Sequence, residues 1–267
     1  MFKNFNYFLA PSIIQAFISF LILIPVTTFY LEPKDFGVVA IIMVIIAPIG
    51  PLASSGAEWI LGSNYFIINE VDRKKLIFNT LLVDFSLKSL WVLLYWLSGS
   101  FILDFVIAEY DTSYKQLFEI ALIGVLAGMF WPTVNALLII QKKAKLYFAL
   151  EIIRNLISLV SVLIFLIVLE LGVISLFLGP LIVNTISLFF EIIFLSKNIK
   201  IEISRKWIEE VIKTGLPAIP SNLAETIGNI SDRYFIQYFL SLSTLGIYSH
   251  AQSYSNIFKF IYKALTK

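Results

Sequence analysis

The chain lacks several residue types on which protein chemistry commonly depends. Its 267 residues include no cysteine and a single histidine, His250. The absence of cysteine excludes disulfides, thiolate metal ligands and cysteine nucleophiles, and one histidine cannot build a histidine-based metal site. No Gly-rich phosphate loop is present, which argues against ATP hydrolysis. We therefore predict that the protein has neither a metal site nor a cofactor.

Charged residues are also scarce, whereas apolar residues are abundant. Only 14% of the residues are charged and 59% are hydrophobic, with a mean hydropathy of +0.88. Soluble domains have about 25% charged residues. The apolar residues form eight stretches, most of them at or above the roughly 20 residues that a helix needs to cross a bilayer. The stretches are 8–30, 36–61, 76–103, 116–140, 147–169, 171–195, 215–240 and 245–262. The sequence predicts an all-α fold, a polytopic membrane helix bundle whose first span is retained, because it lacks a small-residue cleavage signal.

Lysine and arginine residues fall mostly in alternate gaps between these stretches. They are Lys3, Arg73, Lys74, Lys75, Lys142, Lys143, Lys145, Lys197, Lys200, Arg205, Lys206, Lys213, Lys259, Lys263 and Lys267. Basic residues in short loops stay on the cytoplasmic side during insertion, so both termini are predicted to be cytoplasmic. The net charge of +2 would meet membrane lipids with anionic head groups there, and it requires no nucleic acid as a partner.

The regions of the first two and the last two stretches share short elements at a constant offset of 209 positions. Pro11-Ser12 matches Pro220-Ser221, Tyr30-Leu31 matches Phe239-Leu240, and Phe36-Gly37-Val38 matches Leu245-Gly246-Ile247. Such self-similarity is typical of parallel repeats in transporters. We predict a six-helix N-terminal transmembrane lobe (1–200), followed by a linker and the first two helices of an incomplete second lobe (201–267). The chain is expected to be a truncated product or an excerpt.

Two pairs of opposite charges lie inside the predicted spans. A charge at mid-membrane costs about 2.5–3.5 kcal/mol, so those that persist often mark a transport path. Asp84 and Lys88 are four residues apart, and Glu151 and Arg154 are three apart. Each pair either neutralises itself within one helix or serves such a path.

The remaining intramembrane charges are single residues or direct neighbours. Asp232 and Arg233 are about 100° apart on a helix, so they need separate partners: another helix, a coupling ion or substrate. Glu58 and Glu191 lie near helix ends, which favours side chains that reach the interface. His250 is interpreted as a hydrogen-bonded residue in preference to a proton relay.

Four short elements resemble a known family. They are Leu-Glu-Pro-Lys-Asp-Phe-Gly at 31–37, Gly-Leu-Pro-Ala-Ile-Pro at 215–220, Ser-Asp-Arg-Tyr-Phe at 231–235 and Leu-Gly-Ile-Tyr at 245–248. The chain is similar in these elements to the polysaccharide biosynthesis family, the O-antigen and capsule repeat-unit flippases of the multidrug, oligosaccharidyl-lipid and polysaccharide exporter superfamily. The resemblance implies a non-enzymatic transporter in the bacterial inner membrane, with two six-helix lobes around a cavity. It would move an undecaprenyl-pyrophosphate-linked oligosaccharide across the membrane by alternating access.

The resemblance also implies roles for the intramembrane charges. Lys88, Arg154 and Arg233 are expected to bind the pyrophosphate of the lipid-linked oligosaccharide. Asp84, Glu151, Glu225 and Asp232 are expected to bind a coupling cation, Na⁺ or H⁺, or to line the cavity. One departure from the family pattern is that acids outnumber bases in the spans, which puts a strongly cationic cavity in question.

Three other readings remain open. An acidic surplus suits a cation-coupled multidrug exporter of the same superfamily. The truncated chain could also be a non-functional fragment. A membrane enzyme of polysaccharide synthesis is disfavoured, because its catalytic groups would need an outer scaffold and the longest outward gap, 104–115, is short.

Overall fold

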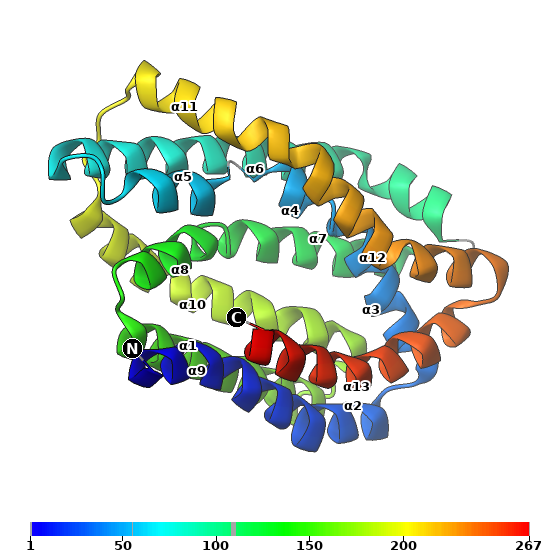
Figure 1. Cartoon of the computed structure of the whole chain (residues 1–267). Helices are drawn as coiled ribbons and strands as arrows, with labels where there is room; N and C mark the ends of the chain where they lie inside the picture. The colour runs from blue at the N-terminus through cyan, green and yellow to red at the C-terminus, as the bar shows by residue number, and fades with distance from the viewer. Residues whose placement is uncertain (1, 55, 108–110, 267) are drawn as a thin grey trace.

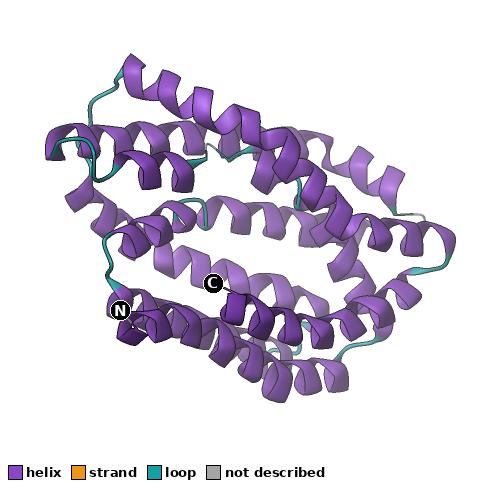
Figure 2. Ribbon diagram, viewed as in Figure 1, coloured by secondary structure: helices purple, strands orange, loops and turns teal. Residues whose placement is uncertain are grey.

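The computed structural model describes residues 2–54, 56–107 and 111–266, and every regular element in these ranges is a helix (Figure 2). The elements are α1 (Phe2–Ile18), η1 (Ser19–Leu23), α2 (Ile24–Tyr30), α3 (Pro33–Ile46), α4 (Ile49–Leu52), α5 (Ala57–Asn64), α6 (Glu70–Val106), α7 (Thr112–Ala127), α8 (Trp131–Ile140), α9 (Ala144–Leu163), η2 (Ile164–Val168), η3 (Gly172–Ile174), α10 (Ser175–Asn198), α11 (Arg205–Gly215), η4 (Leu216–Ala218), α12 (Ile219–Phe239) and α13 (Leu242–Thr266). The all-α prediction is confirmed.

Within the described ranges, six helical segments are long and apolar enough to cross a membrane. They are Ala10–Tyr30, Pro33–Leu52, Glu70–Val106, Thr112–Ile140, Ala144–Val168 and Gly172–Asn198. These segments correspond to the first six predicted stretches, and they make the chain a multi-pass membrane protein. Helices α12 and α13, in the seventh and eighth stretches, are 21 and 25 residues long but more polar. Their polar side chains form the second group of charges described below.

Proline residues mark the places where three spans are interrupted. Pro25 lies in the first turn of α2 after the π-helical segment η1, Pro48 precedes α4, and Pro132 lies in the first turn of α8. Proline has no backbone N–H and is tolerated at a helix start, where that group has no intrahelical partner. The second and fourth spans are therefore each built from two shorter helices, whereas α1, η1 and α2 of the first span follow one another without a gap.

The connections between spans alternate between the two ends of the bundle (Figure 1). The α5–α6, α8–α9 and α10–α11 connections lie at the end that carries the N-terminus, and the α2–α3, α6–α7 and α12–α13 connections lie at the opposite end. The connections that are rich in lysine and arginine thus lie together, at the end of the bundle that carries the N-terminus. That this end faces the cytoplasm stays a prediction.

The linker between α10 and α11 is hydrogen-bonded to a buried side-chain amide of α6. The side chain of Asn79 is fully buried; its Nδ2 donates to the Glu202 carbonyl at 2.9 Å, and its Oδ1 accepts from the Ser204 N–H at 2.9 Å. Hydrogen bonds from Lys75 and Lys200 lower the pKa of the Glu202 carboxyl. The amphipathic helix α11 then packs on α5 and α6.

Replacing Asn79 by leucine should loosen this linker. The change leaves the Glu202 carbonyl and the Ser204 N–H without their partner, and each buried group left unpaired costs about 1–3 kcal/mol. We expect a lower thermal unfolding midpoint in detergent. Asn229→Leu, at an exposed position of α12, is the matched control. Equal midpoints for the two variants would contradict the role of Asn79.

Helices α3 and α13 cross with their backbones in direct contact at two glycines. A Cβ atom on Gly37 would overlap the carbonyl oxygen of Leu242, and one on Gly246 would overlap the carbonyl oxygen of Pro33. Both glycines and both contacted residues are 209 positions apart, the offset of the sequence repeat. Reciprocal contacts of this kind are what a two-fold axis produces. The crossing therefore has the geometry expected of two parallel repeats.

Candidate functional site

The intramembrane charges collect in two groups. The first, which we call the lobe network, lies among α6, α8, α9 and α10. It comprises Asp84, Lys88, Trp131, Thr133, Glu151, Arg154, Asn184, Ser187 and Glu191. The second, which we call the α12–α13 site, comprises Thr28, Asp232, Arg233, Tyr248, His250 and Gln252.

Arg154 of α9 is the centre of the lobe network. Its Nη1 donates to the Ser187 hydroxyl and lies 3.5 Å from Glu191 Oε1. Its Nη2 donates to Asn184 Oδ1 at 3.0 Å. The guanidinium carbon also stacks over the Trp131 ring, 4.1 Å from the ring centroid, which is a cation–π arrangement. The guanidinium thus has protein partners on two other helices, α8 and α10.

Lys88 of α6 extends the network. Its Nζ donates to the Met129 carbonyl at 2.8 Å, where α7 ends before α8 begins, and it interacts electrostatically with Asp84 and Glu191. The Asp84 Oδ2 atom accepts from Thr133 Oγ1 at 3.4 Å. The two charges of the predicted Asp84–Lys88 pair therefore also contact groups on other elements.

The prediction that the Glu191 side chain reaches the membrane interface was wrong. Its side chain is 0% exposed, so it does not reach an interface. Its Oε1 accepts from Ser187 Oγ at 2.9 Å and faces Arg154, whereas its Oε2 has no hydrogen-bond partner. Position near a helix end misled the sequence prediction, because α10 is covered at this point by neighbouring helices. The side chain of Glu58, for which the same prediction was made, lies outside the described residues.

Glu151 occupies the same lobe on α9. It interacts electrostatically with Arg154, the residue with which the sequence pairs it, and lies near Trp131. The ion pair of Arg154 is nevertheless with Glu191 of α10, whose Oε1 lies 3.5 Å from Arg154 Nη1. The network therefore joins helices instead of neutralising charge within one helix.

The neighbours Asp232 and Arg233 have separate partners on α13, as their spacing predicts. Asp232 Oδ2 accepts from the Tyr248 hydroxyl, and Arg233 Nη2 donates to Gln252 Oε1 at 2.7 Å. Both bonds join α12 to α13. Glu225, by contrast, lies at an exposed position of α12.

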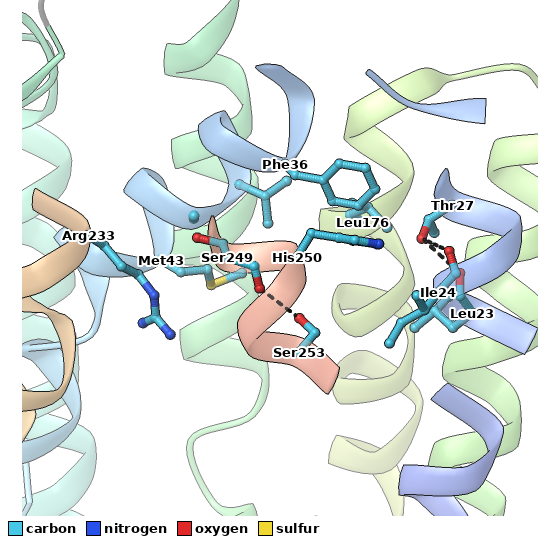
Figure 3. Close-up of a pocket in the computed structure, with 12 residues that line it drawn as sticks. Leu23, Ile24, Thr27, Phe36, Met43, Leu176, Arg233, Ser249, His250 and Ser253 are labelled. Atoms are coloured by element: carbon cyan, nitrogen blue, oxygen red, sulfur yellow. Dashed lines mark hydrogen bonds between the residues drawn. The ribbon is translucent and has the colours of Figure 1, made fainter. Parts of the chain in front are cut away.

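A cavity of about 310 Å³ opens beside this pair, between α2, α3, α12 and α13 (Figure 3). Arg233 reaches it from α12, Ser249 and His250 from α13, and Thr27 from α2. The hydroxyl of Ser249 is buried without a hydrogen-bond partner. The cavity therefore offers one guanidinium and several hydrogen-bonding groups to a small polar ligand.

His250 is a hydrogen-bonded residue, as the sequence predicts. Its Nε2 lies 3.1 Å from Thr28 Oγ1, and its ring packs on Phe36 with 4.8 Å between centroids. It also belongs to an apolar groove of about 550 Å³ that passes Leu31 and Ile247. The polar cavity and the apolar groove thus meet at His250 and Phe36.

The sequence prediction missed several members of both groups. Asn184, Ser187 and Glu191 form a polar stripe at i, i+3 and i+7 in an apolar helix, a signal that could have been used. Tyr248 and Gln252 gave no comparable signal. In the described residues, no three histidine or acidic side chains lie close enough together to hold a metal ion.

Comparisons with known proteins agree with this fold. A model of the family described as polysaccharide biosynthesis protein matches residues 29–267. None of the curated proteins matches the chain. A solved structure named "protein A" aligns with a TM-score of 0.70 and 16% identity, over 97% of this chain and 61% of that one.

A second solved structure is titled "Outward-facing conformation of a multidrug resistance MATE family transporter of the MOP superfamily". It aligns with a TM-score of 0.67 and 14% identity, over 97% of this chain and 65% of that one. The chain thus spans less than two thirds of either structure, and at these identities the likeness shows a common fold. Since the family model covers most of the chain, the resemblance found in the sequence is confirmed, and the protein belongs to the polysaccharide biosynthesis protein family.

Proposed function

We propose that the protein is a flippase that moves an undecaprenyl-pyrophosphate-linked oligosaccharide across a bacterial inner membrane by alternating access. Its family supports a substrate from polysaccharide biosynthesis, and its transporter-like fold supports passage through the membrane in preference to catalysis. A glycan and a pyrophosphate cannot cross hydrocarbon unaided, so they need a polar route inside the protein.

The observation that carries this proposal is the position of Arg233 at the wall of the 310 Å³ cavity. Arginine suits phosphate because its planar fork of donors matches phosphate oxygens. Binding pockets for small ligands measure about 300–1,000 Å³, so this cavity suits a pyrophosphate head group but not a complete lipid-linked glycan. The adjoining apolar groove past His250 is suited to a hydrocarbon chain.

Within this proposal Lys88 and Arg154 act differently from Arg233. Both cations already contact protein carbonyl, amide, hydroxyl or carboxylate groups in the lobe network. We therefore assign the direct pyrophosphate contact to Arg233, and we assign the lobe network to the shape and charge of the six-helix lobe.

A multidrug exporter of the same superfamily is the second candidate. The acidic surplus of the lobe network favours cationic cargo, and one similar structure is titled as a multidrug transporter. The two candidates differ in what they require of Arg233, because a cationic drug gains nothing from a guanidinium whereas a pyrophosphate does.

Replacing Arg233 by alanine should reduce surface polysaccharide by about tenfold, since a hydrogen bond to a charged group contributes about 1.5–3 kcal/mol. The measurement is surface polymer in cells that carry the variant as their sole copy. Lipid-linked oligosaccharide should accumulate in the inner leaflet at the same time. Arg233→Lys should retain part of the activity.

Arg205→Ala is the matched control, because the Arg205 side chain is 92% exposed and pairs with Glu209 one turn away on α11. The control should leave surface polymer unchanged. Full polymer in Arg233→Ala at normal protein levels would contradict the pyrophosphate contact. Drug resistance that depends on the protein and is unchanged in that variant, with polymer intact, would favour the second candidate.

A further inference from the structure

We propose that a groove between α6 and α10 binds one anionic phospholipid of the surrounding membrane, with a hydrocarbon chain in the groove and the phosphate at lysine residues beside its mouth. The groove, which we call the α6–α10 groove, measures about 400 Å³ and shares no lining residue with the Arg233 cavity or the groove at His250. The inference goes beyond the proposed function, because this lipid would stay with the protein and is not the transported one.

The α6–α10 groove is lined almost entirely by apolar side chains. Phe78 and Phe85 contribute from α6, Ile192 from α10, and Ile201 from the linker that follows α10. Ser196 is the one polar lining residue, and its hydroxyl already donates to a carbonyl of its own helix. A single helical turn, about 10–12 Å wide and about 5.4 Å long, needs more room than this groove provides, whereas a hydrocarbon chain is thin enough to lie in it.

The linker 199–204 presents apolar side chains to the outside and polar ones to the protein. Its sequence alternates as Ile-Lys-Ile-Glu-Ile-Ser, and its backbone is extended at both ends, so that alternate side chains point to opposite faces. Ile201 and Ile203 are 80% and 72% exposed, whereas Glu202 is half-buried and pairs with Lys75 of α6. A linker in water would show the reverse arrangement. The isoleucine face is therefore suited to contact with lipid.

The position of the groove along the bundle matches the depth of a hydrocarbon chain. Lysine side chains stay at the membrane boundary, so Lys75 marks the region where α6 leaves the hydrocarbon layer. Phe78 lies three residues beyond Lys75 and Phe85 lies ten residues beyond it. At about 1.5 Å per residue, the groove reaches to about 15 Å from this boundary. That depth is half of the ~30 Å hydrocarbon core, which is the share of one leaflet.

Lysine residues give the mouth of the groove an excess of positive charge. Lys200 lies between two lining residues of the linker, and Lys197 follows the lining residue Ser196. Glu202 pairs with both Lys75 and Lys200, so one carboxylate serves two ammonium groups. Lys197 is exposed, and none of the described carboxylates pairs with it. Two positive charges thus remain for a phosphate, and each basic residue at an anionic membrane surface strengthens binding about fivefold.

A lipid in this position would brace the junction between the first six spans and the helices that follow. Its hydrocarbon chain would contact α6 and α10 together, and its phosphate would contact lysines of both α10 and the linker. The linker leads into α11, which packs on α5 and α6. Bound lipid would therefore add to the hydrogen bonds of Asn79 in fixing the linker on α6.

The test is lipid binding to the purified, delipidated protein in detergent, measured by native mass spectrometry. Phosphatidylglycerol and phosphatidylcholine with the same acyl chains are added separately. We expect one phosphatidylglycerol to bind at least about fivefold more tightly than phosphatidylcholine. Lys197→Gln combined with Lys200→Gln should weaken phosphatidylglycerol binding by about tenfold, since Glu202 already uses part of the Lys200 charge.

Lys142→Gln combined with Lys145→Gln is the matched control, because it removes two exposed lysines from the same end of the bundle. The control should leave binding unchanged. Ser196→Phe should fill the groove and reduce the binding of both lipids. Ser86→Phe, at an exposed position of α6 outside the groove, should retain binding.

A second measurement uses the absence of cysteine from the chain. A nitroxide attached at Ile203→Cys, in protein reconstituted into phosphatidylglycerol vesicles, should collide more with oxygen, which dissolves in lipid, than with a water-soluble nickel complex. Glu209→Cys, on the exposed side of α11, should show the opposite preference. This label reports the position of the linker without any change to the groove or its lysines.

Equal affinities for the two lipids would overturn the proposal, as would full binding in Ser196→Phe. A loss in the Lys142 and Lys145 control as large as that in the Lys197 and Lys200 variant would assign binding to the general charge of this end and remove the site. A nickel-accessible label at position 203 would place the linker in water and contradict the lipid contact. A dimer that Ser196→Phe dissociates would give the groove to a second copy instead.

Discussion

Replacement of Gly246 by leucine is expected to force helices α3 and α13 apart and to lower the stability of the protein far more than a leucine at a glycine with open space around it. At this crossing a Cβ alone would already overlap the Pro33 carbonyl oxygen, and it would lie 2.9 Å from the Gly37 amide nitrogen. Backbone atoms cannot rotate aside as a flexible side chain can. Overpacking of a tight core costs about 1–3 kcal/mol and sometimes more, and this contact belongs to the upper part of that range.

The measurement is the thermal unfolding midpoint in detergent, read together with the elution profile in size-exclusion chromatography. Gly228→Leu on α12 is the matched control, because a Cβ there meets nothing within 4 Å. Gly37→Leu should give a loss similar to that of Gly246→Leu, since the two contacts are reciprocal. A midpoint for Gly246→Leu equal to that of the control would show that the helices do not cross as described.

Arg154→Ala is expected to produce the second large loss of stability. Removing one partner of a buried ion pair costs about 3–5 kcal/mol, because the remaining charge is left uncompensated. The change would leave Glu191 facing only the more distant Lys88, and it would also remove a partner of Ser187 and of Asn184. The effect should appear as a lower unfolding midpoint and as greater sensitivity to protease.

The double variant Arg154→Ala with Glu191→Gln should recover much of this loss, because it removes the uncompensated charge as well. Such a cycle measures the coupling between the two residues directly. Arg205→Ala supplies the comparison for an exposed pair, which typically contributes less than about 1 kcal/mol. Strictly additive losses in the cycle would show that Arg154 and Glu191 do not interact.

The spans of this protein could be predicted from its sequence because membrane insertion depends on length and hydropathy, which are local properties. Stretches 76–103 and 147–169 lie within or along the helical segments Glu70–Val106 and Ala144–Val168. The offset of 209 positions also links Gly37 with Gly246 in the sequence, although no contact between these two glycines was predicted from it.

The partners of the charged residues could not be predicted in the same way. Arg154 has an acid three residues away on its own helix, yet its ion pair is with Glu191, 37 positions further along the chain. Which helix covers the end of α10 depends on tertiary packing, and that decided whether Glu191 would be exposed. The separation of Asp232 from Arg233 followed from helix geometry, whereas Tyr248 and Gln252 were recognisable only once α13 lay against α12.

The crossing of α3 and α13 resembles a self-contact between the two subunits of a homodimer, because Gly37 and Gly246 each meet the backbone of the other helix. In a true homodimer every mutation appears twice, so the two sides of a self-contact can never be altered one at a time. In this protein, position 37 and position 246 are encoded separately. Each side can therefore be changed alone, and any difference between the two responses reports how differently the two sides of this contact tolerate an added side chain.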